Sequence, residues 1–205
     1  MEKPTVSVII PVYNKREYIT ETVNSVLNQD FGSFEIIVVD DGSTDDSLEV
    51  VMSINDPRLQ IFSQSNSGVE RSRNFGFSKS VGPFVVYLDA DDLMSSNRLR
   101  KQVDLFNATK DLVMVGTWAS VIDQSGNTIG SIRPPTSNTA LQLAHLFRNQ
   151  FVCSSVMIKR SALENGVVFN ETRGKRFAED FDLWLRIARK GRVANIPEML
   201  TTYRR

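Results

Sequence analysis

The chain has 205 residues, of which 24 are Lys or Arg and 24 are Asp or Glu, so it carries no net charge at neutral pH. This balance excludes an overall field that would draw the chain to nucleic acid or to an anionic membrane, and any functional charge must be local. The single cysteine, Cys153, and the single histidine, His145, exclude an intramolecular disulfide and leave too few ligands for a structural zinc site.

The sequence predicts neither a membrane-spanning segment nor a signal peptide. No apolar run approaches the roughly 18 residues that span a bilayer, and the amino-terminal MEKPTV lacks the regions of a signal peptide. With its lone cysteine, the chain fits a reducing compartment, and we expect a cytoplasmic protein. Peripheral attachment at the inner face of the membrane stays open. The length suits one or two domains, and we expect one.

Four short apolar runs predict strands in the first half of the chain, at residues 6–10, 34–39, 59–62 and 84–88. Each run is apolar at successive positions, which is typical of strands buried on both faces of a parallel sheet. Segments with helical spacing lie between and after them, and the residues expected to pack inward include Met52, Val69, Phe77 and Val81. The alternation predicts βαβ crossovers and a doubly wound, nucleotide-binding type of architecture.

The pattern changes from residue 112 onward. Residues 112–123, the turn signal QSGN and the strand that follows it predict an antiparallel hairpin. A helix is expected over 138–148, a strand over 151–159 and a last helix over 178–190, ended by Gly191 in a left-handed conformation. Because no linker or repeat separates the two halves, we expect them to share one core.

Two adjacent carboxylates, Asp40 and Asp41, leave the second predicted strand in the run VVDDGSTDDS, with a turn at Gly42. Part of this run is consistent with a helix entry, because Ser43 or Thr44 can cap a helix and acids suit its first turn. Capping does not explain the two acids at the strand end. A carboxylate there can accept a hydrogen bond from a base N–H or a ribose hydroxyl.

A second acidic cluster, Asp89, Asp91 and Asp92 in YLDADDLMSS, follows the most apolar predicted strand. Carboxylates gathered at one sheet edge cost free energy unless a cation or hydrogen-bond donors offset their repulsion. Magnesium or manganese, held by one or two carboxylates and completed by substrate phosphates, is one solution. The alternative is an acidic helix entry capped by Ser95 or Ser96, and this segment alone does not decide between the two.

Two further charged segments lie on predicted helices. The helix in SGVERSRNFGFSKSVG carries Arg71, Arg73 and Asn74, for which a solvated basic face is the simpler interpretation and contact with a nucleotide or the acids is the other. Glu179 and Asp180 begin the last predicted helix, where acids suit the helix dipole. One of them can instead face a pocket as a general base.

Three common enzyme classes lack their motifs in this sequence. No G-x-G-x-x-G follows the first strand, which disfavours a dinucleotide-binding dehydrogenase. No G-x-x-x-x-G-K-[ST] is present, which excludes a P-loop NTPase. No G-x-S-x-G elbow accompanies the single histidine, so a hydrolase triad is disfavoured as well.

The ordered set VSVIIPVYN, VVDDGSTDDS, GVERSRNFG, LDADD and AEDFDLW resembles the family 2 glycosyltransferases, which are inverting enzymes of the GT-A fold. The resemblance covers nearly the whole chain. It implies an α/β fold with a mixed, mostly parallel sheet flanked by helices. It also implies one catalytic domain over 1–205, with a nucleotide-sugar-binding half at about 1–111 and an acceptor-binding half at about 112–205.

The resemblance also answers why a buried strand ends in Pro-Val-Tyr-Asn, because in the family this motif lines the pocket for the nucleotide base. Tyr13 would stack on or edge a uracil, and Asp41 would accept a hydrogen bond from it. The implied nucleotide site consists of Pro11, Tyr13, Asn14, Asp40, Asp41, Arg73 and Asp89.

The same resemblance implies a metal site and a catalytic acid pair. Asp91 would coordinate a divalent cation, Mn or Mg, that bridges the donor diphosphate, with Asp92 in support. Asp180 would be the general base, with Glu179 as its neighbour or substitute. The implied reaction is a single in-line displacement at the anomeric carbon, which inverts its configuration.

The implied donor is a nucleotide-sugar, preferably UDP-linked, and the implied acceptor is a saccharide or a lipid-linked saccharide in cell-surface polysaccharide or glycan synthesis. A non-catalytic nucleotide-sugar-binding domain of a larger synthase stays open, although the presence of both Asp91 and Asp180 favours catalysis. A sugar-phosphate nucleotidyltransferase is disfavoured, because residues 11–14 are not the glycine-rich basic loop that a triphosphate requires.

The second half is expected to shape the sugar pocket, with Trp118, Arg133, Phe151 and Ser154 as candidate wall residues. These residues identify neither the sugar nor the acceptor. Many members of the family continue beyond a segment like LTTYRR, residues 200–205, into a loop that carries a histidine near the metal. We therefore expect either a truncated catalytic domain or a minimal member of the family.

Overall fold

The computed structural model describes residues 3–163, 168–171 and 179–205. In this part of the chain, nine strands form one mixed sheet in the order β3-β2-β1-β4-β8-β6-β9-β5, with β7 paired to β6. The pairing directions give β1 to β4, β6 and β9 one orientation and β5, β7 and β8 the opposite one. The strands are β1 (Val6–Val12), β2 (Phe34–Asp40), β3 (Leu59–Ser63), β4 (Phe84–Tyr87), β5 (Leu93–Met94), β6 (Leu112–Ile122), β7 (Thr128–Ile132), β8 (Met157–Lys159) and β9 (Arg192–Arg204).

The four strands predicted from the apolar runs are confirmed. β1 pairs in parallel with β2 and β4, and β2 pairs in parallel with β3. Every residue of β1 and β2 is buried, because helices cover both faces of the sheet. The carboxyl ends of β1, β2 and β4 therefore meet at one edge, where α/β folds of this kind bind their ligands.

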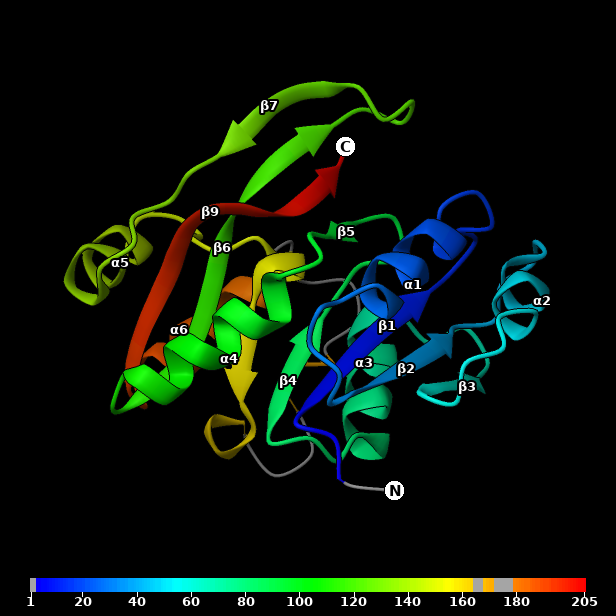
Figure 1. Cartoon of the computed structure of the whole chain (residues 1–205), viewed down its shortest axis with the longest axis horizontal. Helices are drawn as coiled ribbons and strands as arrows, with labels where there is room; N and C mark the ends of the chain where they lie inside the picture. Colours follow the sequence, from blue (N-terminus) through cyan, green and yellow to red (C-terminus); the bar gives the residue numbers. More distant parts are fainter. Residues whose placement is uncertain (1–2, 164–167, 172–178) are drawn as a thin grey trace.

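Helices lie on both faces of the sheet (Figure 1). On one face, α1, α2 and α4 share a core that includes Val23 and Leu99. On the other face, α3, α5 and α6 pack into a second core that includes Phe77 and Trp184. In the described residues, no helix is both long and apolar enough to cross a bilayer. The helices are α1 (Ile19–Leu27), α2 (Ser47–Met52), α3 (Val69–Lys79), α4 (Arg98–Ala108), α5 (Asn138–His145) and α6 (Glu179–Ala188).

Three residues that were expected to pack inward are exposed. Met52, Val69 and Val81 have exposed fractions of 66%, 37% and 46%. Met52 ends a helix of only six residues, and Val69 is the first residue of α3, before its buried positions begin. Val81 lies beyond the end of α3. Each of them is at a helix end, where the apolar periodicity no longer fixes which side faces the core.

The hairpin predicted in the second half is confirmed as β6 and β7, which pair antiparallel. The single strand predicted over 151–159 is wrong, because a 3-10 turn at Cys153–Ser155 precedes a β8 of three residues. Gly191 was expected in a left-handed conformation, but the described glycines with positive φ are Gly42, Gly68 and Gly126. Gly191 is required for space instead, since a Cβ there would lie 2.6 Å from the carbonyl oxygen of Asp111.

The last strand, β9, was not predicted and determines how the two halves meet. It pairs in parallel with β6 over most of its length. β5 pairs antiparallel with its carboxyl end, with Leu93 opposite Thr202. This pairing brings the last residues of β9 beside the acidic turn that follows β4, so residues from both halves border the same edge of the sheet.

Gly82 tests the packing of β4 against β1. A Cβ at this position would lie 2.8 Å from the Ser7 nitrogen and 3.0 Å from the Val6 carbonyl carbon. Because this backbone is fixed in the sheet, we expect Gly82→Ala to lower the free energy of unfolding by about 1–3 kcal/mol. Gly32→Ala is the matched control, since nothing lies within 4 Å of a Cβ there. Urea denaturation measures both variants, and equal stabilities would contradict the close approach.

Candidate active site

A cavity of about 540 Å³ opens at the carboxyl ends of β1, β2 and β4. Its lining joins residues from the sequence clusters that lie far apart in the chain. Of the residues predicted for the site, it contains Pro11, Tyr13, Asp41, Arg73, Asp89 and Asp91. Other lining residues were not predicted as site residues, and those with long polar or aromatic side chains are Lys15, Asn66, Tyr203 and Arg204.

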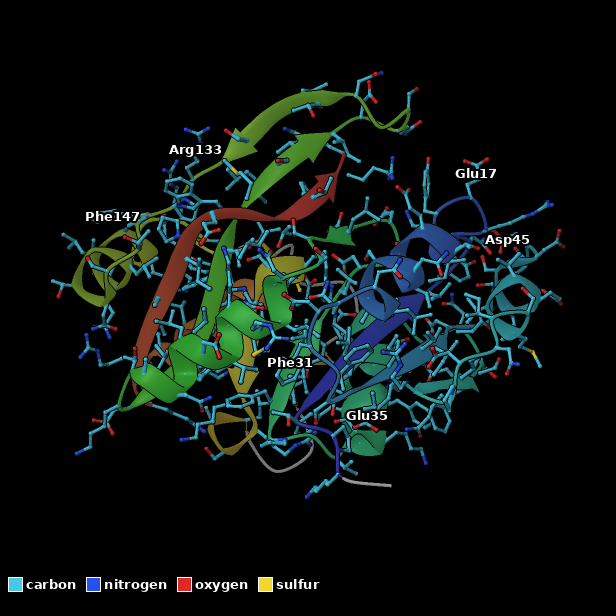
Figure 2. All side chains as sticks on the ribbon, viewed as in Figure 1. Glu17, Phe31, Glu35, Asp45, Arg133 and Phe147 are labelled. Atoms are coloured by element: carbon cyan, nitrogen blue, oxygen red, sulfur yellow. The ribbon has the colours of Figure 1, made fainter. Side chains whose placement is uncertain are left out.

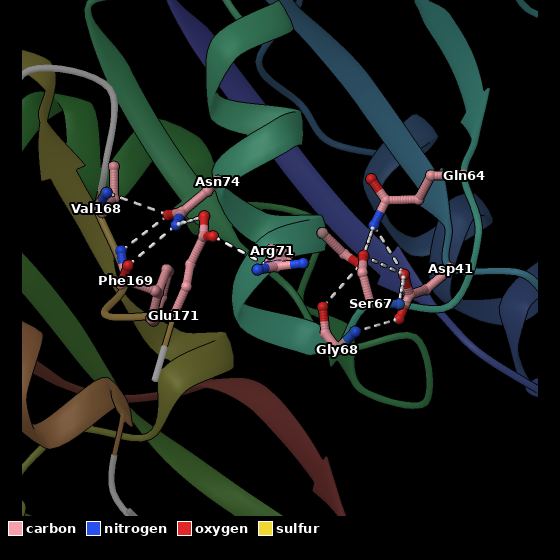
Figure 3. Close-up of polar contacts among 10 residues, drawn as sticks. Asp41, Gln64, Ser67, Gly68, Arg71, Asn74, Val168, Phe169 and Glu171 are labelled. Carbon is pink, nitrogen blue, oxygen red and sulfur yellow. Dashed lines mark hydrogen bonds and ion pairs between the residues drawn. The ribbon is translucent and has the colours of Figure 1, made fainter. Parts of the chain in front are cut away.

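Asp41 is buried in the wall of this cavity and organises the loop that enters α3 (Figure 3). Its Oδ1 accepts hydrogen bonds from Gln64 Nε2 at 2.7 Å and from Ser67 N at 3.0 Å, and its Oδ2 accepts one from Gly68 N at 2.8 Å. Burial alone would raise the pKa of Asp41, but these donors lower it below the usual carboxyl value. The carboxylate therefore stays ionised, and its Oδ2 retains a lone pair for a further donor.

Asn74 fixes the segment 168–171 against α3, as Figure 3 also shows. Its Oδ1 accepts from Val168 N at 3.1 Å and from Phe169 N at 2.8 Å. Its Nδ2 donates to Phe169 O at 3.0 Å and to Glu171 Oε1 at 2.9 Å. Asn74 is absent from the cavity lining, so its role in the structure is to hold this segment in place.

Arg73 is buried, which corrects the interpretation of its helix as a solvated basic face. Its guanidinium forms two ion pairs, with Asp89 Oδ1 at 2.7 Å and with Glu179 Oε1 at 3.2 Å. Burial alone would lower the pKa of Arg73, but Cys153 and these carboxylates raise it, so the side chain remains charged. We call this arrangement the Arg73 bridge, because it joins the acidic turn after β4 to the start of α6.

Asp91 forms an ion pair with Lys15, whose Nζ lies 2.6 Å from Asp91 Oδ2. Lys15 directly follows the Pro-Val-Tyr-Asn motif, and this position is the signal that could have identified it from sequence. No three His, Cys, Asp or Glu side chains converge on a metal position within the described residues. Asp91 still fits a Mg²⁺ or Mn²⁺ ion, because such ions commonly take one or two carboxylates and complete their shell with water and substrate phosphates.

Three residues predicted for the nucleotide and metal sites do not line the cavity. Asp92 is fully buried, and its Oδ1 accepts from Arg204 N at 2.8 Å. Burial, followed by repulsion from Asp89, raises the pKa of Asp92 to about 7. The buried Asp40 accepts from Ser43 N at 3.3 Å.

The third of these residues, Asn14, joins the end of β1 to the loop after β2. Its Oδ1 accepts from Thr44 N at 2.8 Å, and its backbone has a positive φ of 52°, a conformation that Asn adopts more readily than most residues. Asn14, Asp40 and Asp92 are all absent from the cavity lining. The structure thus places them where they support the turns that carry their cavity-lining neighbours.

The acid pair stands at the start of α6, next to the Arg73 bridge. Glu179 is a member of that bridge, whereas Asp180 Oδ2 accepts a hydrogen bond from Asn149 Nδ2 at 2.9 Å. Burial raises the pKa of Asp180 above the usual carboxyl value, against hydrogen bonds from Phe181 N and Asn149 that lower it. Asn149 was not predicted from sequence, since it lies in an irregular segment without a motif.

Asp41→Asn tests whether the ionised carboxylate holds the loop. We expect it to lower the free energy of unfolding by about 2 kcal/mol at neutral pH. The amide cannot form charge-assisted hydrogen bonds, and its NH₂ group would face the N–H groups that donate to the carboxylate. The folded pKa lies below the unfolded value near 3.8, so this stabilisation is present above that value and is lost as the pH falls through the folded pKa. The exposed Asp104, replaced by Asn, is the control.

Urea denaturation at several pH values measures the gap in stability between the wild-type chain and each variant. The gap for Asp41→Asn should narrow below about pH 4. A gap that is independent of pH, or one no larger than that of the Asp104 variant, would show that Asp41 does not act through its charge.

Sequence comparison finds the relatives of this chain. The family model described as Glycosyl transferase family 2 matches residues 7–166. The putative teichuronic acid biosynthesis glycosyltransferase TuaG of Bacillus subtilis is 33% identical over 208 residues, covering 98% of this chain and 79% of TuaG. Uncharacterized glycosyltransferases of Haemophilus influenzae and Rickettsia conorii are 32–35% identical, and the chain spans only 31–66% of their length.

Solved structures show the same fold. S. aureus TarS in complex with UDP aligns with a TM-score of 0.81 at 24% identity, over 98% of this chain and 60% of that of TarS. The mannosyltransferase PcManGT from Pyrobaculum calidifontis, in complex with GDP-Man and Mn²⁺, aligns with a TM-score of 0.72 at 22% identity, over 98% of this chain and 57% of the other. At these identities the likeness establishes the GT-A fold alone. Since the family model matches most of its residues, the chain belongs to glycosyl transferase family 2.

Proposed function

We propose that the chain is the catalytic part of an inverting glycosyltransferase that moves a sugar from a UDP-sugar to a saccharide or lipid-linked saccharide in cell-surface polysaccharide synthesis. The observation that carries this proposal is the Arg73 bridge, which joins Asp89 of the cavity to Glu179 of the acid pair. The UDP complex of TarS supports the donor, and the name of TuaG supports the kind of product.

The nucleoside of the donor binds between β1 and the loop before α3. Tyr13, which is 47% exposed at the cavity, offers its ring for stacking against the base. Asp41 accepts an N–H of the base through the remaining lone pair of Oδ2. Pro11 borders the same pocket and Asp89 contacts the ribose or the sugar, while Asn14 and Asp40 hold the two loops that carry Tyr13 and Asp41.

The diphosphate of the donor lies beside Lys15 and Asp91. Asp91 would hold a divalent cation there, and the ion would supply Lewis-acid stabilisation of the charge on the leaving nucleoside diphosphate. Lys15 releases Asp91 and turns its ammonium to the same phosphates. Asp92 does not reach the ligand, and supports Asp91 by anchoring the backbone of Arg204.

The acceptor hydroxyl is deprotonated by Asp180. As its oxygen attacks the anomeric carbon, the proton moves to Asp180 and the bond to the diphosphate breaks on the opposite face, so the anomeric configuration inverts. A carboxylate with a raised pKa is a stronger base than an ordinary one, and burial provides that shift for Asp180. Glu179 forms an ion pair with Arg73, and this contact fixes the position of the base relative to the donor cavity.

A second candidate function is a nucleotide-sugar-binding domain of a larger synthase without activity of its own. It is favoured by one observation, that neither Glu179 nor Asp180 lines the cavity at the strand ends. Both candidates bind the donor, but only a transferase requires a base at Asp180. Donor binding and transfer therefore have to be measured separately.

The first test concerns the donor and the cation. We expect calorimetric titration with UDP to show binding that depends on Mn²⁺ and that weakens by at least about tenfold in Asp91→Ala, because the ion loses its protein ligand. Asp104→Ala, on the exposed side of α4, should bind as the wild-type chain does. UDP binding that is independent of the ion and survives Asp91→Ala would refute the metal assignment.

The second test concerns the base. We expect Asp180→Asn to keep UDP binding and to lower kcat by about 10²–10⁴-fold, because the amide cannot take the proton. In the wild-type chain, kcat/KM should rise with pH through a pKa above the usual carboxyl value, since Asp180 must be deprotonated. UDP release from a panel of UDP-sugars with saccharide acceptors measures both. Unchanged transfer by Asp180→Asn would refute the assignment, and UDP binding without transfer by either protein would favour the binding domain.

A further inference from the structure

A second hollow is connected to the acid pair through Asn149, which donates a hydrogen bond to Asp180. It is a groove of about 400 Å³ between the end of β7 and the segment that follows α5. Arg133 comes from the first of these walls, and Arg148, Asn149 and Phe151 come from the second. We call it the arginine groove, and its lining shares no residue with the cavity at the strand ends.

The arginine groove carries positive charge that nothing in the described structure neutralises. Arg133 and Arg148 are both exposed, and neither forms an ion pair with a described residue. Residues 124–163 include no Asp or Glu, although the chain has 24 of these residues. Figure 2 shows Arg133 at the α5 end of the molecule, with Glu17 and Asp45 at the opposite end.

The walls of the groove are fixed, although its arginines are unpaired. Trp118 Nε1 donates to Pro134 O at 3.0 Å, and the guanidinium of Arg133 lies 5.5 Å from the centre of the Trp118 ring. Asn195 of β9 donates through Nδ2 to the carbonyl oxygens of Pro135, at 3.0 Å, and of Gln150, at 3.4 Å, so it ties one wall to the other. A ligand therefore meets a preformed surface and has little backbone to order on binding.

Asn149 connects the groove to the base. It lies in the groove lining, and its Nδ2 donates to Asp180 Oδ2 at 2.9 Å. Its Oδ1 accepts from Phe151 N at 3.0 Å, which fixes the amide in this orientation. The groove lining is therefore one hydrogen bond away from the proposed base.

We infer that the arginine groove binds the acceptor and that the acceptor is an anionic saccharide, carrying carboxylate or phosphate groups. This inference rests on the proposed function and adds the chemical class of the acceptor. Guanidinium groups bind both kinds of anion through paired N–H donors. Among the described residues, the groove lining includes no carboxylate that would repel an anion, and a neutral sugar would form only weaker, uncharged hydrogen bonds with the two arginines. The donor diphosphate is not the ligand of the groove, because it has its own cation, Lys15, in the other cavity.

The test is calorimetric titration of the 205-residue chain with three hexameric probes: hexagalacturonate for carboxylates, a glycerol phosphate hexamer for phosphates, and maltohexaose as the neutral reference. It is carried out without UDP or divalent ions, because the anionic probes themselves bind metals. We expect at least one anionic probe to bind about tenfold or more tighter than maltohexaose, with an affinity that falls as salt is added. Which anionic probe binds distinguishes a carboxylate acceptor from a phosphate one.

Variants locate the binding. Arg133→Gln and Arg148→Gln should each weaken the anionic probe by about three- to tenfold, as expected for the loss of one exposed or half-exposed charged contact. Arg192→Gln is the matched control, since Arg192 is exposed at the start of β9 and lines neither hollow. Both arginine variants remove exposed side chains, so their folding should be unaffected, and circular dichroism verifies this.

The outcomes separate this inference from the proposed function. Equal affinity for all three probes, or anion binding that Arg133→Gln and Arg148→Gln leave unchanged, would overturn the inference even if UDP binds. Failure of UDP to bind would count against the proposed function alone, because the probes are titrated without it. Anion binding that is lost in the Arg192 variant as strongly as in the groove variants would show non-specific attraction and would also overturn the inference.

Discussion

The active site depends on one buried charge, the guanidinium of Arg73. A buried cation is costly unless it is paired, and here two carboxylates from different parts of the chain, Asp89 and Glu179, provide the partners. The cost of leaving any of the three unpaired makes the arrangement cooperative. Because Asp89 follows β4 and Glu179 begins α6, the need to neutralise Arg73 fixes the distance between the nucleotide cavity and the acid pair. The same pairing keeps α6 oriented toward the site.

The end of β9 contributes to the wall of the same cavity, and there too a largely buried arginine is held by several acceptors. Arg204 is nearly buried, and its guanidinium donates to the Asp91 carbonyl oxygen at 3.1 Å and to Glu21 Oε2 at 3.0 Å, while its backbone nitrogen donates to Asp92. Arg204 therefore contacts both the backbone carbonyl of Asp91, the candidate metal ligand, and the carboxylate of Asp92. These hydrogen bonds hold the turn that carries the Asp91 side chain in place.

The sequence predicted the strands of the first half and the residue clusters of the cavity well, because strands buried on both faces leave continuous apolar runs and ligand sites gather at their carboxyl ends. The sequence could not show which acid of each adjacent pair lines the cavity. In each pair one carboxylate lines the cavity, Asp41 or Asp91, and the other is buried behind it, Asp40 or Asp92. Consecutive side chains near a strand end point in different directions, and only tertiary pairing decides which one faces the ligand.

For Asp92 the deciding contact comes from Arg204, 112 residues later in the chain. The strand that brings it there, β9, contains a proline, a glutamate and several polar residues, so it lacks the apolar pattern that identified the other parallel strands. It is nevertheless a strand because β6 and β5 supply pairing partners on both sides. The sequence therefore does not indicate that β9, with Tyr203, lines the cavity.

The same reasoning separates the two members of the acid pair. A carboxylate in a direct ion pair with a buried arginine is committed to that contact, because breaking the pair would leave a buried charge unpaired. Glu179 has that position, whereas Asp180 is bound by a neutral amide, Asn149, and by a backbone N–H, and burial is the largest influence on its pKa. Arg73 thus pairs with one acid and leaves the other, whose pKa burial raises, in contact with Asn149 of the arginine groove. The division of labour between two adjacent carboxylates follows from which of them the buried guanidinium contacts.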